Sequence, residues 1–510
     1  LNLKETTQDM VEVLAQITTQ RSQDIAQKGF AFGYEIPQKR IHPLIKPCFE
    51  PILLIAEIKR ASPSAGQIGA INSPTKLASD YLNGGAGAIS VLCEERHFNG
   101  SLADLMQVKN AYPKACILRK DFIQYPEEIE ISYCAGADMV LLIVAMFIDE
   151  DAGFARFKAI YDECLKHGLT PLIEVHNHNE IDFITPLNPA LVGINARNLH
   201  TFNINIPAAC TLKNALPHSR VIFESAINSP HSAFIVGSFG FDGLLCGSYL
   251  VEHNNPSAAI TALKSAINLS KKQKVAFYSC VFDKFVKRTK PIIKICGITQ
   301  LDNALEVTKE QTNGGVDMLG FILVAHSPRY IESKHIKEIA KALQTLYPHI
   351  LRVAVVNDKP SLNEAKALYE QGHIHAIQLH GLDSKNPQYF ANIALKDALF
   401  PYYVVQNIAQ KADFSPHYEG AFCLVDSKST QGGGSGKSIE FEVLRSLKES
   451  YLCIAGGINI DNISDFLALK PAMLDINSGI ESVAGKKDIA KLRALLQKVA
   501  SYTSPLKSNK

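Results

Sequence analysis

The stretch Pro51–Gly66, PILLIAEIKRASPSAG, sets the pattern for the whole chain. Its apolar run ends in Glu57 and Lys59, and a loop of Ser, Pro and Gly follows, which is typical of a buried strand that presents polar groups at its C-terminal end. Residues two apart share one face of a strand, so Ile55, Glu57 and Lys59 point the same way. Opposite charges on an apolar strand are costly unless they are paired or used. The two residues therefore form either a structural ion pair or part of an active site.

Short apolar runs of this kind recur along the first half of the chain, with helix-like segments between them. They begin near residues 52, 86, 115, 139, 169, 191, 220 and 241, a step of roughly 27 residues. That step fits one strand, one helix and two loops. Eight such units in about 250 residues predict a closed (β/α)8 barrel rather than an open sheet.

A second set of eight runs opens at Pro291–Thr299, PIIKICGIT, and its members begin near residues 291, 316, 350, 374, 401, 421, 451 and 472. The predicted fold class is therefore α/β, with two tandem (β/α)8 TIM barrels. We expect the first barrel at 1–267, with a helical leader at 1–45, and the second at 291–510. The alternating basic and apolar residues of 268–290 indicate a solvated linker helix, and a nucleic-acid or membrane role for this piece is the less favoured alternative.

The composition excludes several classes of protein. A chain of 510 residues is too long for one hydrophobic core, and a net charge of +2 gives no field that would attract nucleic acid or an anionic membrane. No apolar stretch approaches the length of about 18 residues that a transmembrane helix needs, and the first residues lack a signal-peptide core. Because the sequence starts at Leu1, we expect its natural first residue to be absent. The 11 Cys are scattered without a C-x-x-C pair, which predicts reduced thiols in the cytoplasm and no zinc site.

Polar or small residues stand where the strands of the first barrel end. They are Glu57, Lys59, Lys120, Glu174, Asn195, Arg197, Glu224, Ser225, Gly247 and Ser248. Active sites of such barrels lie at the C-terminal ends of the strands, so we expect these residues to meet at one mouth. Lysines and carboxylates crowded together shift one another's pKa, which suits acid–base catalysis. The residues after the last two strands are in the place where such barrels bind phosphate.

Five motifs of the first half resemble the indole-3-glycerol-phosphate synthase family. They are AEIKRASPSAG at Ala56–Gly66, ILRKDF at Ile117–Phe122, IEVH at Ile173–His176, GINARNL at Gly193–Leu199 and ESAI at Glu224–Ile227. The resemblance implies ring closure of 1-(2-carboxyphenylamino)-1-deoxyribulose 5-phosphate with loss of CO2 and water. It implies that Lys120 protonates the departing hydroxyl, that Glu174 is its acid–base partner, and that Lys59 contacts the substrate carboxylate.

The same resemblance implies that Glu57 and Asn195 position reacting groups and that Glu224 lies against the substrate. We expect substrate and phosphate binding by Ser62, Arg197, Ser225, Gly247 and Ser248. The sequence departs from the family where Ala65 replaces a usual Lys and Ala226 a usual Gly. Neither departure removes a proton-transfer group, so we expect the activity of the first barrel to be tuned and not lost.

In the second barrel, Lys294 and Cys296 share a strand face. A lone Cys in an apolar strand is usually core filler, but its place at a strand end favours a functional thiol. Further strand-end candidates are Arg329, His380, Asp426, Gly456, Gly457, Asn477, Ser478 and Gly479. The Gly-rich ends of the last two strands are the expected phosphate site.

The segment Gln431–Ser438, QGGGSGKS, is similar to a phosphate-binding P-loop. A P-loop has the form G-x-x-x-x-G-K-[ST], and the position five residues before Gly436 is Gln431 instead of Gly. We therefore reject nucleotide hydrolysis and predict a mobile active-site loop after the sixth strand.

The motifs KICGIT, SPRY, QLHG, LVDSKSTQGGGSGK, IAGGIN and DINSGIE resemble the phosphoribosylanthranilate isomerase family over the whole second barrel. The resemblance implies an Amadori rearrangement of N-(5-phosphoribosyl)anthranilate, whose product is the substrate implied for the first barrel. By the same resemblance Cys296 is the base, Asp426 is the acid and Arg329 pairs with the anthranilate carboxylate.

Two alternatives remain beside a bifunctional tryptophan-pathway enzyme. One is another pair of phosphosugar barrels, such as the histidine-pathway isomerase and cyclase, which carry Asp at the ends of strands 1 and 5. The other is that one barrel is a degenerate binding or scaffolding domain, against which the acid–base groups in both halves argue. We expect small phosphosugar–anthranilate substrates, no cofactor, no metal, no nucleic acid or membrane partner, and a monomer.

Overall fold

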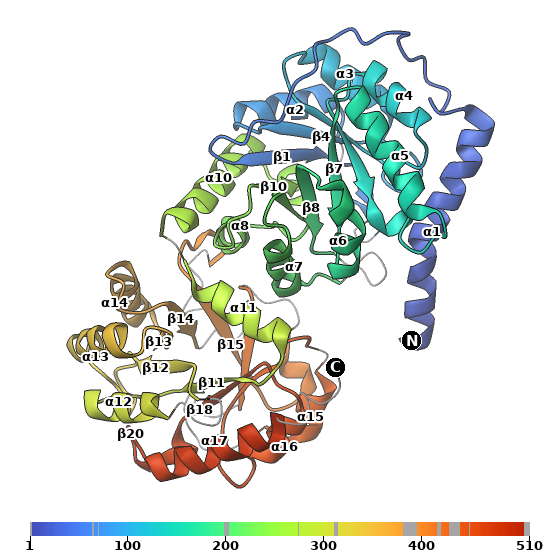
Figure 1. Cartoon of the computed structure of the whole chain (residues 1–510). Helices are drawn as coiled ribbons and strands as arrows, with labels where there is room; N and C mark the ends of the chain where they lie inside the picture. Colours follow the sequence, from blue (N-terminus) through green and yellow to red (C-terminus); the bar gives the residue numbers. More distant parts are fainter. Residues whose placement is uncertain are drawn as a thin grey trace. The chain divides into compact units, whose positions relative to one another are not determined.

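A computed structural model of the chain describes residues 3–63, 66–69, 71–197, 203–273, 275–310, 315–380, 395–415, 420–427, 439–447 and 449–503, with side chains between residues 14 and 502. The chain divides into two compact units, Leu1–Gln273 and Lys274–Lys510. Figure 1 follows the chain through both units.

The first unit is a closed barrel of eight parallel strands, which confirms the predicted fold class. Each strand lies where an apolar run predicted it. The strands are β1 (Leu53–Ile58), β4 (Ala88–Leu92), β5 (Ile117–Lys120), β6 (Met139–Ile143), β7 (Thr170–Val175), β8 (Leu191–Asn195), β9 (Arg220–Glu224) and β10 (Gly243–Cys246). β1 pairs with both β4 and β10, which closes the barrel. A short antiparallel ladder of β2 (Ala61–Ser62) and β3 (Gly66–Gln67) follows β1.

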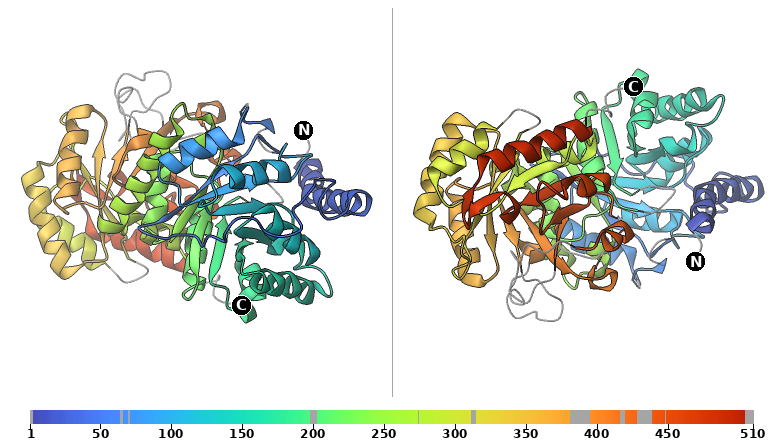
Figure 2. Two further views of the ribbon diagram at one scale, coloured as in Figure 1. Left: turned by 90° about the horizontal axis from the view of Figure 1, so that it is seen from above. Right: turned by 90° about the horizontal axis from the view of Figure 1, so that it is seen from below.

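Helices alternate with these strands around the barrel (Figures 1 and 2). They are α2 (Pro74–Asn83), α3 (Leu102–Ala111), α4 (Glu127–Ala135), α5 (Gly153–Lys166), α6 (His178–Ile184), α7 (Ile206–Leu212), α8 (Pro230–Gly237), α9 (Ser248–Glu252) and α10 (Pro256–Gln273). Several begin after a Ser or Asn whose side chain accepts a hydrogen bond from the first turn, as Ser73, Ser101 and Asn177 do. Such caps satisfy N–H groups that have no partner within the helix.

The inward face of β1 carries the site. Leu53 and Ile55 belong to the buried cluster that fills the barrel. Glu57 is the next residue on this face and is only 3% exposed. The strand alternation predicted from the sequence therefore places the Glu57 carboxylate above the core, at the C-terminal mouth.

The helical leader is shorter than the predicted span 1–45. Helix α1 ends at Lys28, and the chain then runs through turns and extended backbone to β1. Gly29 and Gly33 have φ angles of 75° and 81°, a conformation that ends a helix and favours glycine. The helix is fixed by Arg21, whose guanidinium contacts Asp121 Oδ1 at 2.7 Å and Glu128 Oε2 at 2.5 Å. The leader is therefore bound to the segment that follows β5.

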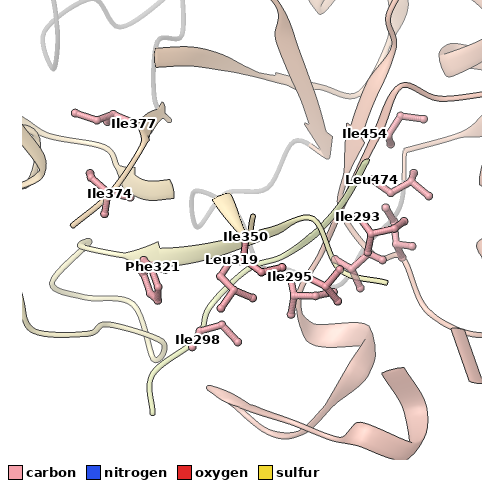
Figure 3. Packing of buried hydrophobic residues seen from close by; sticks show 14 of the residues in the cluster. Ile293, Ile295, Ile298, Leu319, Phe321, Ile350, Ile374, Ile377, Ile454 and Leu474 are labelled. Carbon is pink, nitrogen blue, oxygen red and sulfur yellow. The ribbon is translucent and has the colours of Figure 1, made fainter. Parts of the chain in front are cut away.

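The second unit is also a closed barrel of eight parallel strands, in sequence order. Its strands are β11 (Ile292–Ile295), β12 (Met318–Ile322), β13 (Leu351–Val356), β14 (Ala376–Leu379), β15 (Tyr402–Ile408), β16 (Cys423–Ser427), β17 (Cys453–Ala455) and β18 (Met473–Ile476). Its described outer helices are α12 (Leu301–Lys309), α13 (Ser333–Leu346), α14 (Lys359–Glu370), α15 (Phe441–Ser446), α16 (Ile463–Ala468) and α17 (Ile489–Thr503). Aliphatic side chains from the strands, among them Ile293, Ile295, Leu319 and Phe321, pack into a buried cluster with helix residues (Figure 3). A hairpin of β19 (Glu481–Val483) and β20 (Lys486–Lys487) follows β18.

Most of the span 268–290 is helical, as predicted, but only one face of its helix is exposed to solvent. It contains the end of α10 and all of α11 (Phe277–Lys287), whose aromatic face is buried. The Tyr278 hydroxyl lies 3.1 Å from the carbonyl oxygen of Tyr402, and the ring of Phe285 meets Phe422 edge to face. Tyr402 begins β15 and Phe422 precedes β16, so α11 packs across the N-terminal ends of these strands. The alternation of basic and apolar residues is therefore that of an amphipathic helix covering the base of the second barrel.

Candidate active sites

The charged strand ends of the first barrel meet around one lysine. Lys120 Nζ, at the end of β5, lies 2.8 Å from Glu224 Oε2, 3.6 Å from Glu57 Oε2 and 3.9 Å from Glu174 Oε2. Lys59 Nζ lies 3.0 Å from Glu57 Oε1. The three glutamates are almost fully buried. From the sequence, Glu57 and Lys59 could be either a structural ion pair or part of an active site. In the structure Glu57 contacts both Lys59 and Lys120, so the pair belongs to the Lys120 cluster.

The cluster separates the pKa values of its members. Burial disfavours the Lys120 ammonium, but the charges of Glu224, Glu57 and Glu174 outweigh this and raise the pKa of Lys120 well above its ordinary value. Burial raises the pKa of Glu224 to about 7, with Lys120 opposing the change and Glu174 adding to it. Burial acts on Glu57 in the same direction, but the nearby lysines hold its pKa below the ordinary value. Glu224 is thus a carboxyl that titrates near neutral pH beside a permanent cation.

His176, which is not among the predicted site residues, adjoins Glu174. His176 Nε2 lies 3.3 Å from Glu174 Oε1, and its Nδ1 lies 3.0 Å from Glu180 Oε2. Burial raises the pKa of Glu174, but the contacts of His176 and the charge of Lys120 lower it to about 2. Burial disfavours the imidazolium, yet the two glutamates raise the pKa of His176 to about 10. The available signal was the spacing of His176 and Glu180 at the start of a helix.

The expected phosphate-binding residues lie at the same mouth. Asn195 Oδ1 accepts hydrogen bonds from Ser225 Oγ at 2.7 Å and from the backbone N–H of Arg197 at 3.0 Å. Gly247 precedes α9 and Ser248 opens it. A Cβ on Gly247 would lie 2.5 Å from Glu57 Oε1, so this position has no room for a side chain. Ser62 lies in the ladder after β1 and is partly buried.

The two departures from the family pattern have different outcomes. Ala226 adopts a φ of 58°, a left-handed conformation in which glycine is favoured, which explains the usual Gly at this place. Ala65 lies outside the described residues.

The mouth of the second barrel holds a cavity of about 530 Å³. The predicted site residues that line it are Cys296, Arg329, His380, Asp426, Gly456, Gly457, Asn477 and Ser478. Gly479 does not line it; a Cβ there would lie 2.0 Å from the carbonyl oxygen of Ile458, so this glycine permits a close approach of two backbones. Asn357, Gln378 and Asp475 also line the cavity and were not predicted. Gln378 and Asp475 are single polar residues within apolar runs, which gives no distinct signal, whereas Asn357 directly follows β13 and its place at a strand end could have identified it.

A buried network lies beneath this cavity. Lys294 Nζ lies 2.5 Å from both Asp475 Oδ2 and Gln378 Oε1. Burial raises the pKa of the Cys296 thiol, and the Lys294 ammonium opposes that rise. Gln378 Nε2 lies 2.7 Å from His380 Nε2, and burial together with Lys294 lowers the pKa of His380 to about 4. His380 is therefore neutral at pH 7, with Nε2 as the hydrogen-bond acceptor.

Asp426, at the end of β16, faces the same cavity as Cys296. Burial raises its pKa to about 6, although the Ser427 backbone N–H donates to its Oδ1 at 2.7 Å. An aspartic acid with this pKa keeps roughly one tenth of its protons at pH 7. The cavity thus combines a thiol with a carboxyl that can act as a proton donor.

Arg329 is held by a residue far away in sequence. Its Nε and Nη2 lie 2.9 Å and 2.7 Å from the two carboxylate oxygens of Glu481. Lys487 Nζ lies 2.7 Å from Glu481 Oε1. The Glu481 carboxylate therefore fixes both Arg329 and Lys487. Because this cluster has two positive charges and one negative charge, its net charge at the cavity wall is positive. The segment QGGGSGKS, predicted as a mobile loop, lies outside the described residues.

No group of three or more His, Cys, Asp and Glu side chains in the described ranges is placed to hold a metal ion. No helix in the described part of the chain has the length and apolar character to cross a membrane.

Two family models match the chain. Residues 5–263 match the model described as "Indole-3-glycerol phosphate synthase", and residues 293–498 match "N-(5'phosphoribosyl)anthranilate (PRA) isomerase".

The chain is 28% identical over 530 aligned residues to a multifunctional tryptophan biosynthesis protein of Schizosaccharomyces pombe, covering 96% of this chain and 66% of that protein. It is 29% identical to tryptophan biosynthesis protein TrpCF of Helicobacter pylori, covering 88% of this chain and 90% of that protein. An indole-3-glycerol phosphate synthase of a Nocardioides species is 42% identical over 208 residues, covering 41% of this chain and 78% of that enzyme.

Proposed function

This chain belongs to the indole-3-glycerol phosphate synthase family and continues into a domain that matches the isomerase family, and from this premise we propose that it catalyses two consecutive steps of tryptophan biosynthesis. The second unit makes the aminoketose and the first unit closes the indole ring. The observation that carries the proposal is that each barrel mouth joins a group that can donate a proton to a group that can accept one. Lys120 lies among three glutamates in the first mouth, and Cys296 and Asp426 face one cavity in the second.

In the second unit, the reaction begins at the ribose ring of N-(5-phosphoribosyl)anthranilate. Asp426 gives its proton to the ring oxygen as the C1–O bond breaks and the nitrogen lone pair forms a C1=N bond. Cys296, as thiolate, then removes the proton from C2, and the resulting enolamine tautomerises to the aminoketose. Support comes from the raised pKa of Asp426, near 6, and from the Lys294 ammonium, which opposes the rise that burial gives to the pKa of the Cys296 thiol.

Arg329 is suited to bind the anthranilate carboxylate at this mouth. Glu481 engages the Nε and Nη2 edge of the guanidinium, which sets its orientation at the cavity wall. We assign the phosphate to the loops after β17 and β18, near Gly457 and Ser478. Gly456 and Gly457 have φ angles of 92° and 65°, so the loop after β17 adopts a backbone conformation that favours glycine.

In the first unit, the aryl carbon that bears the carboxylate attacks the C2 carbonyl of the aminoketose. Ring closure converts this carbonyl into a hydroxyl with uptake of one proton from solvent, and loss of CO2 restores the aromatic ring. Lys120 then donates the second proton to the hydroxyl, which leaves as water, and Glu174 accepts the proton that C1 of the aminoketose releases as the C1=C2 bond forms. We assign Lys59, whose Nζ lies 3.0 Å from Glu57 Oε1, to the substrate carboxylate. We assign the phosphate to Ser225, Gly247 and Ser248, after β9 and β10.

We further propose that the protein acts as a cytoplasmic monomer. All 11 cysteines are free, which fits a reducing compartment. The described catalytic groups of each mouth come from strands of a single barrel, so neither site needs a second copy of the chain. Light scattering from the purified protein tests the monomer.

The function is tested by supplying each substrate to the purified chain. We expect loss of N-(5-phosphoribosyl)anthranilate fluorescence and, from the aminoketose, formation of indole-3-glycerol phosphate. Cys296→Ala should remove the first reaction and leave the second. A chain that turns over one substrate only would favour the alternative in which one barrel is a binding or scaffolding domain.

A further inference from the structure

His176 lies between two carboxylates at the point where β7 leads into α6. Its Nδ1 is 3.0 Å and its backbone nitrogen 2.8 Å from Glu180 Oε2, while its Nε2 is 3.3 Å from Glu174 Oε1. The side chain is 7% exposed. The imidazole is thus removed from solvent and contacts the residue assigned as the acid–base partner of Lys120.

Glu180 is itself fixed, so the imidazole cannot turn freely. Its Oε1 accepts a hydrogen bond from Asn177 Nδ2 at 2.6 Å, and its backbone N–H donates to Asn177 Oδ1 at 3.1 Å. Its other oxygen accepts both bonds from His176. Donation of the Nδ1 proton to Glu180 directs Nε2 toward Glu174. The loop thus fixes the ring from behind.

The two oxygens of Glu174 meet different cations. Oε1 faces His176, and Oε2 lies 3.9 Å from Lys120 Nζ. Asn195, through a side-chain hydrogen bond, and the Glu224 carboxyl also act on Glu174. Since the lysine also contacts Glu224 and Glu57, it cannot alone hold Glu174 in one orientation.

We propose that His176 is a positioning residue for ring closure, which Glu180 fixes as an imidazolium so that it orients the Glu174 carboxylate and keeps it an anion. This inference rests on the proposed ring-closing function of the first unit. A purely structural histidine, which only joins β7 to α6, would leave the protonation of Glu174 unaffected. Two positive groups on opposite oxygens, by contrast, define where the Glu174 lone pair meets the substrate.

The test uses the full chain with His176→Gln, Glu180→Gln and, as a matched control, His178→Gln, an exposed histidine in the first turn of α6. We expect His176→Gln to lower kcat for ring closure by about tenfold to a hundredfold, the scale of a small misplacement of a reacting group. The acid limb of kcat/KM should move to higher pH, because Glu174 loses the cation that keeps it ionised. His178→Gln should behave as wild type.

Glu180→Gln gives a second, independent readout. His176 then has one anion instead of two, so it should lose its proton at lower pH, and kcat should fall on the alkaline side where wild type is flat. The isomerase activity of the same samples normalises for intact chain, and thermal unfolding checks the first unit. Unchanged pH profiles in both variants, or a loss of kcat no larger than the loss of folded protein, would overturn the proposal. A wild-type chain that does not close the ring would instead overturn the proposed function.

Discussion

The three glutamates at the first mouth are similarly buried, yet their pKa values differ because different cations face them. Burial by itself would raise the pKa of each of the three carboxyl groups. Glu57 contacts two lysines, and Glu174 contacts His176 and Lys120, so both pKa values fall below the ordinary value. Glu224 faces Lys120 with Glu174 beside it and keeps a pKa of about 7. One carboxyl of the cluster is therefore able to exchange a proton near neutral pH.

Lys120→Met tests the centre of this cluster. Removal of a general acid from a reacting oxygen usually costs about a hundredfold or more in rate. We expect ring closure to fall by at least that factor, while the isomerase activity of the same chain is unchanged. Lys114→Met, at an exposed lysine before β5, is the control and should leave both activities intact. Near-normal formation of indole-3-glycerol phosphate by Lys120→Met would exclude the assignment.

Asp426→Asn separates activity from stability. Burial raises the pKa of Asp426 to about 6, above the ordinary value near 3.9, so the folded state binds this proton more tightly than the unfolded state. Binding of this proton stabilises the folded state by about 3 kcal/mol. This contribution to the free energy of unfolding is complete below about pH 4 and is lost as the pH rises through 6. Asn keeps the oxygen that accepts from Ser427 and carries no charge.

We therefore expect Asp426→Asn to abolish isomerase activity and to raise the free energy of unfolding of the second unit at pH 8. Chemical denaturation at pH 4 and pH 8 measures the difference, which should be small at the lower pH. Asp461→Asn, at an exposed position, should change neither quantity. A variant that is less stable than wild type at pH 8 would contradict the buried, proton-retaining carboxyl.

At the scale of single elements, α1 is fixed by a buried ion cluster next to the catalytic lysine. Arg21 contacts Asp121 and Glu128, and its guanidinium lies 4.4 Å from the ring centre of Phe32. Asp121 directly follows Lys120 in the chain. Docking of the leader is thus linked to the end of β5.

Arg21→Ala leaves two carboxylates without one of their partners, and breaking a buried ion pair costs about 3–5 kcal/mol. We expect the first unit to unfold at a lower denaturant concentration, with ring closure reduced and isomerase activity unchanged. Lys28→Ala removes a more exposed pair with Glu95, at 3.3 Å, and should cost less than about 1 kcal/mol. Equal effects of the two substitutions would contradict the anchoring role of Arg21.

The sequence predicted the strands well and the contacts between distant elements poorly. Apolar runs located every strand of both barrels, and the two-residue alternation placed Glu57 on the inner face of β1. Strand ends also located the charged residues, because parallel strands of a barrel end at one mouth. Arg329 pairs with Glu481, which lies 152 positions away in the β19–β20 hairpin. No local sequence pattern predicts this contact. The burial of the aromatic face of α11 depends on the strand ends that it covers, so the sequence of this helix alone indicates a solvated linker.

At the scale of the whole molecule, two barrels occupy one chain and each contains its own strands and proton-transfer groups. The described residues of each mouth come from one unit only. α11 packs on the second barrel through Tyr278 and Phe285, so it belongs with that unit when the chain is divided. A cut beside Lys274, between α10 and α11, separates the units without crossing a strand.

The most direct test of two independent active sites is to express residues 1–273 and 274–510 separately and assay each half with both substrates. Each half should be folded, because it retains a complete barrel and core. We expect ring closure by 1–273 alone and isomerisation by 274–510 alone, each with the kcat of the full chain. Two soluble, folded halves that turn over neither substrate would contradict it.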